Sequence, residues 1–278
     1  MLTISESLPL SKPAAELGLP LICYHNHFSD GSVSASSAQG AHPAEMAIDP
    51  FTATAWIGEE GEGEWWIRVQ KPNADANYAA VTGWRGDQSL GSGAIPASLT
   101  GVSVRLQYSD DGGETWEDAA GPVEPNDRVA GFLFETANHE DWRFLFEADA
   151  PPEIVNVSLG IATEMDAGFT SGFQPPRQAR NNQILNNNTD QGHLIGRSVI
   201  RRGISTSLDV ENVDEAWVRN VWEPLADHLE TRAAYVIWNP VRWPDEIAYV
   251  WPSRDLRAPS YTSNAGWMRV RVDVEGIA

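Results

Sequence analysis

The chain has 278 residues, 12 tryptophans, one cysteine and a formal net charge of −20, and this length is enough for about two domains. Residues 1–165 hold 25 acidic and 7 basic side chains, whereas residues 166–278 hold 14 acidic and 12 basic ones. The first half should therefore repel phosphate backbones and anionic membranes, and we expect no nucleic-acid partner. With Cys23 alone, no internal disulfide or cysteine-based zinc site can form, and the lack of an apolar run of about 18 residues argues against membrane insertion.

The first half of the chain has the pattern of a sandwich made of short strands. Residues 64–70 and 102–108 alternate between apolar and polar side chains, as half-buried strands do. Turn signals separate these segments from one another, which is typical of an all-β sandwich or barrel. Further strands are expected at residues 21–24, 78–84, 129–135, 142–147 and 154–160.

The second half, residues 166–278, is predicted to be an α+β domain with one helix on a small sheet. Residues 161–192 are rich in Gly, Pro, Gln and Asn, and this composition predicts a linker or a long arm. Asn212 and Glu215 resemble a capping box, and apolar side chains spaced four apart follow it. These are Val213, Trp217, Val221, Leu225 and Leu229, with Pro224 expected to kink or split the helix. Extended segments are expected at 193–198, 199–205, 234–238, 247–251 and 267–273.

Four motifs in residues 33–160 resemble, in order, the discoidin (F5/8-type-C) family. They are Ala47-Ile-Asp49 with Thr52, Thr54 and Trp56; Trp65-Trp-Ile-Arg-Val69; Val104 to Trp116; and Trp142-Arg-Phe-Leu-Phe146. The resemblance implies a galactose-binding-like jelly-roll sandwich that binds glycans or lipids through loops at one end. It places Trp84 and Arg85 as ligand contacts and Trp56 in the core.

The segment Ser109-Asp-Asp-Gly-Gly-Glu-Thr-Trp116 also has the pattern of an Asp-box. We interpret it as a tight hairpin turn in which Asp111 accepts backbone N–H groups, Gly113 takes a positive φ and Trp116 packs back. A sialidase would need several copies and an arginine cluster. A calcium ion at Asp110 and Asp111 stays an open alternative, although no further oxygen ligands lie nearby in the sequence.

No catalytic constellation stands out, so we expect a protein that is not an enzyme and needs no cofactor. His25, His27 and Asp30 are spaced for a metal ion, but no further ligand lies at suitable spacing, so we predict no metal site. A glycosidase pair among the 39 carboxylates stays an alternative that sequence alone does not resolve. Without signal-peptide features at the N-terminus, we expect synthesis in a cytoplasm.

Nearly the whole chain resembles, in scattered short motifs, a family of tail proteins of long-tailed bacteriophages. The motifs are Gln191-Gly-His-Leu-Ile-Gly196-Arg-Ser198, Arg202-Gly203, Trp217-Val-Arg219, Trp238-Asn-Pro240, Trp243-Pro244 and Tyr249-Val-Trp251, together with an opening from Leu8 to Asn26. Trp243-Pro244 departs from that family's usual Tyr-Pro. The resemblance implies a discoidin-like domain joined to a distal-tail or hub-like assembly domain, and residues 170–191 have the composition of an arm that reaches a neighbour.

The leading hypothesis is therefore a structural protein of a virion tail tip or baseplate, made in the host cytoplasm, that assembles into a homo-oligomeric ring. Its expected partners are the tail tube, the hub, the tape measure and a host surface glycan. Because Trp and Arg are enriched at interfaces, the interface candidates are Arg197, Arg201, Trp217, Arg219 and Trp243. The alternative is a carbohydrate-binding protein or an accessory module of a polysaccharide hydrolase.

Overall fold

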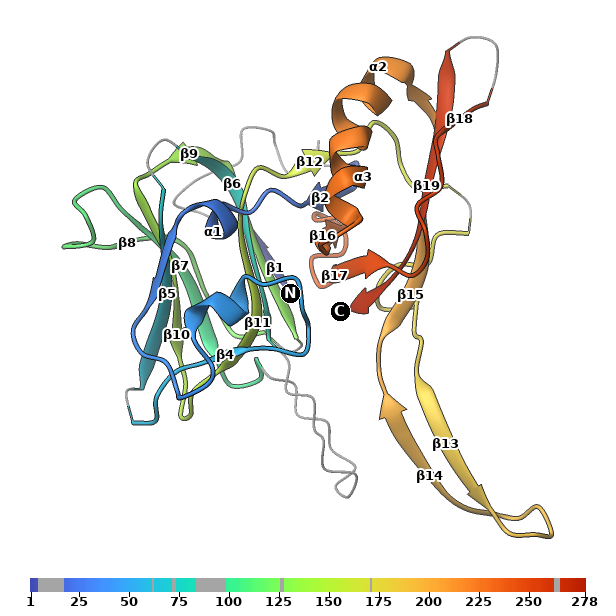
Figure 1. Ribbon diagram of the computed structural model, residues 1–278, viewed down its shortest axis with the longest axis horizontal. Coiled ribbons are helices and arrows are strands. Elements are labelled where there is room, and N and C mark those ends of the chain that lie inside the picture. Colours follow the sequence, from blue (N-terminus) through green and yellow to red (C-terminus); the bar gives the residue numbers. More distant parts are fainter. Residues whose placement is uncertain are drawn as a thin grey trace.

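The computed structural model describes residues 1–4, 18–61, 63–71, 74–83, 99–125, 128–170, 172–262 and 266–278, and it is mostly β (Figure 1). Two five-stranded sheets form a sandwich, and a third, seven-stranded sheet carries the main helix. A two-stranded hairpin projects from the third sheet. The predicted fold class, a jelly-roll-like sandwich followed by an α+β unit, is confirmed. Within the described part of the chain, no helix has the length and apolar character needed to cross a membrane.

The sandwich consists of a first and a second sheet. The first sheet has the order β1 (Leu2–Ile4), β9 (Val129–Asn138), β6 (Asp75–Gly83), β11 (Glu153–Gly160) and β4 (Trp56–Ile57). The second has the order β3 (Ser32–Ala35), β5 (Glu64–Gln70), β10 (Asp141–Glu147), β7 (Ser103–Ser109) and β8 (Glu117–Val123). Two short helical turns, α1 (His27–Asp30) and η2 (Ala44–Ala47), accompany these strands.

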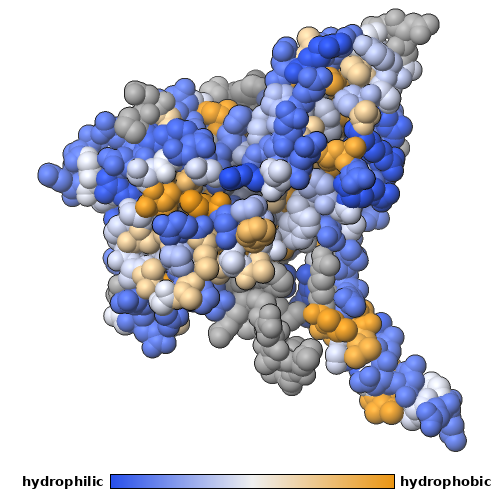
Figure 2. All heavy atoms as spheres, viewed as in Figure 1, coloured by the Kyte–Doolittle hydropathy of each residue, from blue (hydrophilic) through white to orange (hydrophobic). Residues whose placement is uncertain are grey.

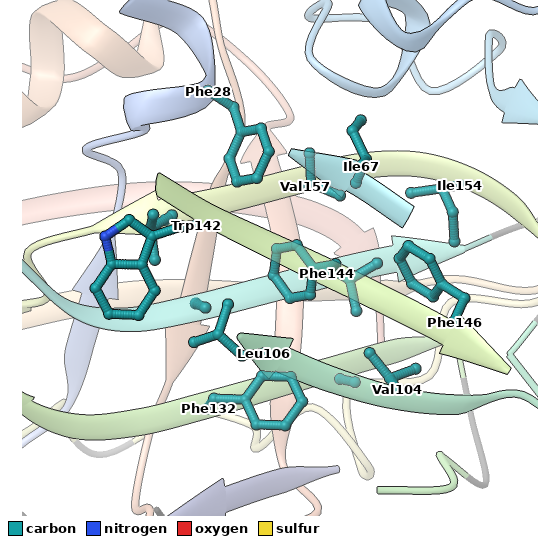
Figure 3. Packing of buried hydrophobic residues seen from close by; sticks show 14 of the residues in the cluster. Phe28, Ile67, Val104, Leu106, Phe132, Trp142, Phe144, Phe146, Ile154 and Val157 are labelled. Carbon is teal, nitrogen blue, oxygen red and sulfur yellow. The ribbon is translucent and has the colours of Figure 1, made fainter. Parts of the chain in front are cut away.

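Large apolar side chains fill the space between the two sheets. Alternation along β5 turns Trp65, Ile67 and Val69 inward, as the sequence predicted, because successive side chains of a strand point to opposite faces. Figure 3 shows the aromatic part of this core, to which Phe144 of β10 and Phe132 of β9 contribute. Trp56 is completely buried here, which confirms its predicted place in the core.

The third sheet has the order β12 (Thr163–Glu164), β2 (Leu21–Cys23), β16 (Ala234–Ile237), β17 (Ile247–Pro252), β19 (Trp267–Ile277) and β15 (Ile204–Asp214), with β18 (Ser260–Tyr261) beside β19. Two of its strands, β2 and β12, come from the first 165 residues. The predicted division between residues 165 and 166 stays a prediction. Cys23 is buried, and burial raises the pKa of its thiol.

The first sheet of the sandwich packs against one face of the third sheet. Their apolar contacts form a separate cluster that includes Tyr78 and Leu133 from the sandwich and Tyr235, Ile247 and Tyr249 from the third sheet. These side chains are buried, and the same surface contains hydrogen bonds between buried polar groups. The two parts of the chain therefore share one cluster of buried apolar side chains.

The main helix covers the opposite face of the third sheet. It runs through α2 (Glu215–Trp217), the π-helical turn η3 (Val218–Trp222) and α3 (Glu223–Leu229). Its N-cap is Asp214, whose carboxylate accepts a hydrogen bond from the Ala216 backbone N–H at 2.7 Å. The predicted cap, Asn212, instead has a φ of +59° where β15 is irregular against β19. Pro224 lies at the second position of α3, directly after the π turn.

The buried face of this helix differs in part from the prediction. Val218, Trp222, Leu225 and Leu229 are buried, whereas Trp217 is only half-buried. A strict spacing of four residues drifts around a helix that has 3.6 residues per turn, so spacings of three and four must alternate to keep one face. The sequence prediction extended the spacing of four too far toward the N-terminus.

Candidate functional sites

The hairpin formed by β13 (Gln183–Asn188) and β14 (Leu194–Arg201), here called the arm, has no core of its own. Every residue of β13 is exposed. Six of the eleven large exposed hydrophobic side chains of the described residues lie on it. They are Ile184, Leu185, Leu194, Ile195, Val199 and Ile200, exposed by 39 to 70%. Figure 2 shows apolar patches along this projection. Such a surface on an isolated hairpin is typical of an interaction site.

The arm also revises how the polar segment before it was interpreted. The stretch Asn186-Asn-Asn188, expected in a linker or an arm, is a paired strand. The residues before the hairpin pack against the third-sheet unit. Met165 and Ala179 are buried there, and Arg180 forms a β-bridge with Ile204. The hairpin extends away from the rest of the described residues (Figure 1).

The predicted interface residues do not gather on one surface. Arg197 is exposed on β14 of the arm, and Arg201 ends the same strand, with a side chain outside the described part of the structure. Arg219 is exposed on the helix, where it pairs with Glu215 at 2.6 Å. The helix and the arm extend from opposite ends of the third sheet (Figure 1), so Arg219 and Arg197 belong to different surfaces.

Two predicted interface tryptophans differ in their accessibility. Trp217 packs at the edge of the core beneath the helix. Trp243 lies in the loop between β16 and β17 with 46% of its surface exposed, and the Arg242 guanidinium lies 5.6 Å from its ring centroid. The predicted ligand contacts Trp84 and Arg85 lie outside the described residues.

The Asp-box segment forms the predicted hairpin turn between β7 and β8. The Asp111 carboxylate accepts the Thr115 hydroxyl and the backbone N–H groups of Glu114 and Thr115. Gly113 has a φ of +90°, and the Trp116 indole N–H donates to the Gly113 carbonyl at 3.1 Å. The hydrogen bonds from Thr115 hold the pKa of Asp111 well below its ordinary value. Asp110 pairs with His139 at 2.9 Å.

The segment around His25 and His27 connects the third sheet to the sandwich. Asn26 caps α1 and donates to the Val157 carbonyl at 2.8 Å. His27 Nε2 lies 2.8 Å from the Asp75 carbonyl. Burial lowers the pKa of both histidines, more than any neighbouring charge does. Among the described residues, no group of three or more His, Cys, Asp or Glu side chains is placed to hold a metal ion.

The outer face of the second sheet, here called the distal face, lies on the side of the sandwich away from the third sheet (Figure 1). Arg143 is paired in register with Arg68 on one side and Gln107 on the other. Its guanidinium lies 4.1 Å from the Trp116 ring centroid, and its Nε donates to Gln107 at 2.7 Å. Burial lowers the pKa of Arg143. Half-buried Trp66 lies two residues before Arg68 on β5 and on the same face of that strand.

A cleft of about 930 Å³ lies between the sandwich and the third-sheet unit. Residues 50–53 of the sandwich form one wall, and residues 229–233 and 251–256 form the others. Phe51, with 63% of its surface exposed, lies at the rim. Because the lining comes from three segments far apart in the sequence, no local motif could have predicted this site.

Comparison with protein-family models gives no match, and comparison with curated proteins gives none either. Among solved structures, the chain is similar to chitosan-binding module 1 of a chitosanase/glucanase from Paenibacillus sp. IK-5, with 20% identity, a TM-score of 0.39 and coverage of 49% of this chain and 98% of that one. It is also similar to a pectin-binding carbohydrate-binding module, with 15% identity, a TM-score of 0.38 and coverage of 48% and 91%. A fucosidase from Ruminococcus gnavus, of which 27% is covered, shares 13% identity at a TM-score of 0.41 over 50% of this chain.

Proposed function

We propose that the chain is a non-enzymatic structural subunit whose arm binds a neighbouring copy of the same chain. The observation that carries this proposal is the exposure of six large aliphatic side chains on a hairpin without a core. A two-stranded hairpin is marginal in water by itself. Contact with another subunit would remove this apolar surface from water and stabilise the hairpin.

Charge complementarity favours a second copy as the partner. The arm, residues 183–201, holds two arginines and one aspartate, a balance of +1. The rest of the chain then carries −21. A positively charged arm attracts the acidic surface of another copy, and the mutual repulsion of acidic surfaces disfavours contacts without the arm.

Head-to-tail contact of this kind closes into a ring when the rotation between subunits allows it. Together with the motifs in the sequence, the arm supports a tail-tip or baseplate subunit of a long-tailed bacteriophage, located in the virion. The tail tube, hub and tape-measure proteins are then its proposed partners, and the sandwich would lie on the outside of the ring.

The test is the oligomeric state in solution. Light scattering coupled to size exclusion should give a defined oligomer for the unmodified chain. Ile195→Asp, at a position that is 70% exposed on the arm, should weaken association at least about tenfold. Its circular dichroism spectrum should stay that of the folded chain because no core is lost. Phe51→Asp, at a 63% exposed position outside the arm, is the matched control. A strict monomer at high concentration, or equal effects of both variants, would contradict the proposal.

A carbohydrate-binding protein is the second candidate function, favoured by the distal face. Residues 1–165 contain only seven basic residues. Three of them, Arg68, Arg105 and Arg143, lie on neighbouring strands of this face. Trp66 and Trp116 accompany them. Aromatic surface beside charged hydrogen-bonding groups is suited to a sugar. A glycan array with the full chain and Trp66→Ala tests this function: loss of binding in the variant is expected, and unchanged binding argues against this face.

A further inference from the structure

The cleft between the sandwich and the third-sheet unit is a preformed site that neither the arm nor the distal face includes. Its volume of about 930 Å³ falls within the range of roughly 300–1,000 Å³ that is usual for pockets binding small molecules. Such pockets occur preferentially between domains. The shared cluster of buried apolar side chains beneath the cleft fixes its walls relative to one another.

The sandwich wall presents an exposed aromatic ring on a rigid loop. Asp49 accepts the Phe51 backbone N–H at 2.8 Å and the Thr54 hydroxyl at 2.8 Å. Trp56, which follows, is completely buried, and its indole N–H donates to the Ser37 carbonyl at 2.9 Å. The backbone is thus held on both sides of Phe51, whose ring nevertheless remains 63% exposed. An exposed ring on a fixed backbone is suited to stacking against the apolar face of a ligand.

The other walls supply a second aromatic ring and two arginines. Trp251 is half-buried, and its indole N–H donates to Glu275 at 3.2 Å. Arg254 pairs with Asp273 at 3.1 Å. Arg232 donates to the Ser29 hydroxyl at 2.9 Å and, within the described part of the chain, forms no ion pair with a carboxylate. Its remaining N–H groups are available to a ligand.

The charge of the lining indicates the kind of ligand. Arg232 and Arg254 are balanced by Glu230 and Asp255, in a chain whose net charge is −20. The two carboxylates repel an anionic ligand, and the two guanidinium groups repel a cation. Two guanidinium donors and two carboxylate acceptors, beside aromatic rings, are complementary to hydroxyl groups on a partly apolar framework.

We infer that this cleft binds a neutral oligosaccharide between the sandwich and the third-sheet unit. Sugar binding in the cleft extends the second candidate function. The cleft and the distal face can be tested separately because the distal face lies on the other side of the sandwich. Both units contribute contacts, so bound sugar would also hold them together and raise the stability of the whole chain by mass action.

Calorimetric titration of the full chain with cellotriose, N-acetylated chitotriose and trigalacturonate tests the inference. A neutral trisaccharide should bind more tightly than the acidic one. Phe51→Ala and Arg232→Gln should each weaken binding about tenfold. Leu194→Ala, at a 62% exposed position on the arm, is the matched control, and Trp66→Ala on the distal face is the second; both should bind as the unmodified chain does.

Three results would overturn the inference. They are the absence of binding by either neutral trisaccharide, tighter binding of trigalacturonate, and unchanged binding by Phe51→Ala. Loss of binding in Trp66→Ala alone would assign the sugar to the distal face and thus separate this inference from the second candidate function. Urea unfolding of each variant distinguishes lost binding from lost folding, and the exposure of Phe51 and Arg232 makes unfolding an unexpected outcome.

Discussion

Removal of one hydroxyl group, that of Tyr235, should measure how strongly the two parts of the chain are joined. Tyr235 of the third sheet has 1% of its surface exposed. Its hydroxyl accepts a hydrogen bond from Thr82 at 3.0 Å and donates one to the Asn156 side-chain oxygen at 3.0 Å. Both partners belong to the sandwich. Tyr235→Phe keeps the ring in place and deletes only this bridge.

The expected loss follows from the burial of the two partners. Thr82 is 0% and Asn156 6% exposed, so water does not readily replace the missing hydroxyl. A buried polar group left without its partner costs about 1–3 kcal/mol, and two such groups lose a partner here. We therefore expect the free energy of unfolding to fall by about 2–6 kcal/mol.

Tyr249→Phe is a control in the same cluster. Tyr249 pairs with Tyr235 in register on β17, and their ring centroids are 4.8 Å apart. Within the described residues its hydroxyl forms no hydrogen bond, so its removal should change stability by less than about 0.5 kcal/mol. Urea titrations followed by circular dichroism and by tryptophan fluorescence supply both values. Similar losses in the two variants, or no loss in Tyr235→Phe, would refute the reasoning.

Two further predictions concern acidification and the Asp-box turn. Burial lowers the folded-state pKa of His25, His27 and His228 below the ordinary 6.5. The unfolded chain therefore binds more protons than the folded one, so stability should be full above pH 6.5 and decrease as the pH falls through the folded-state pKa values. Urea midpoints that are constant or rise between pH 7 and 5 would contradict this prediction. Asp111→Asn removes the charged acceptor of the turn. The backbone amides of Glu114 and Thr115 should then exchange with deuterium faster, while core amides stay protected. Unchanged exchange at these two amides would show that the carboxylate does not hold the turn.

The sequence by itself determined the features that depend on near neighbours in the chain. The alternation of apolar and polar side chains predicted strands β5 and β7, because successive side chains of a strand point to opposite faces. The Asp-box was predictable because Asp111 contacts Ser109 and Thr115 within seven residues of chain. The sequence predicted an arm at residues 170–191, whereas the projecting hairpin spans residues 183–201, because the residues before it pack with the third-sheet unit.

Only the tertiary structure decided which distant segments meet. β2, from the first 25 residues, pairs with β16, more than 200 residues later, and no local pattern encodes that choice. The cleft likewise joins Phe51 to Arg232 and Trp251. The buried hydroxyl of Tyr235 gives no sequence signal, because a tyrosine in an apolar strand looks the same whether its partner is water or Asn156. Such contacts arise from the packing of whole sheets, which depends on the summed burial of many side chains.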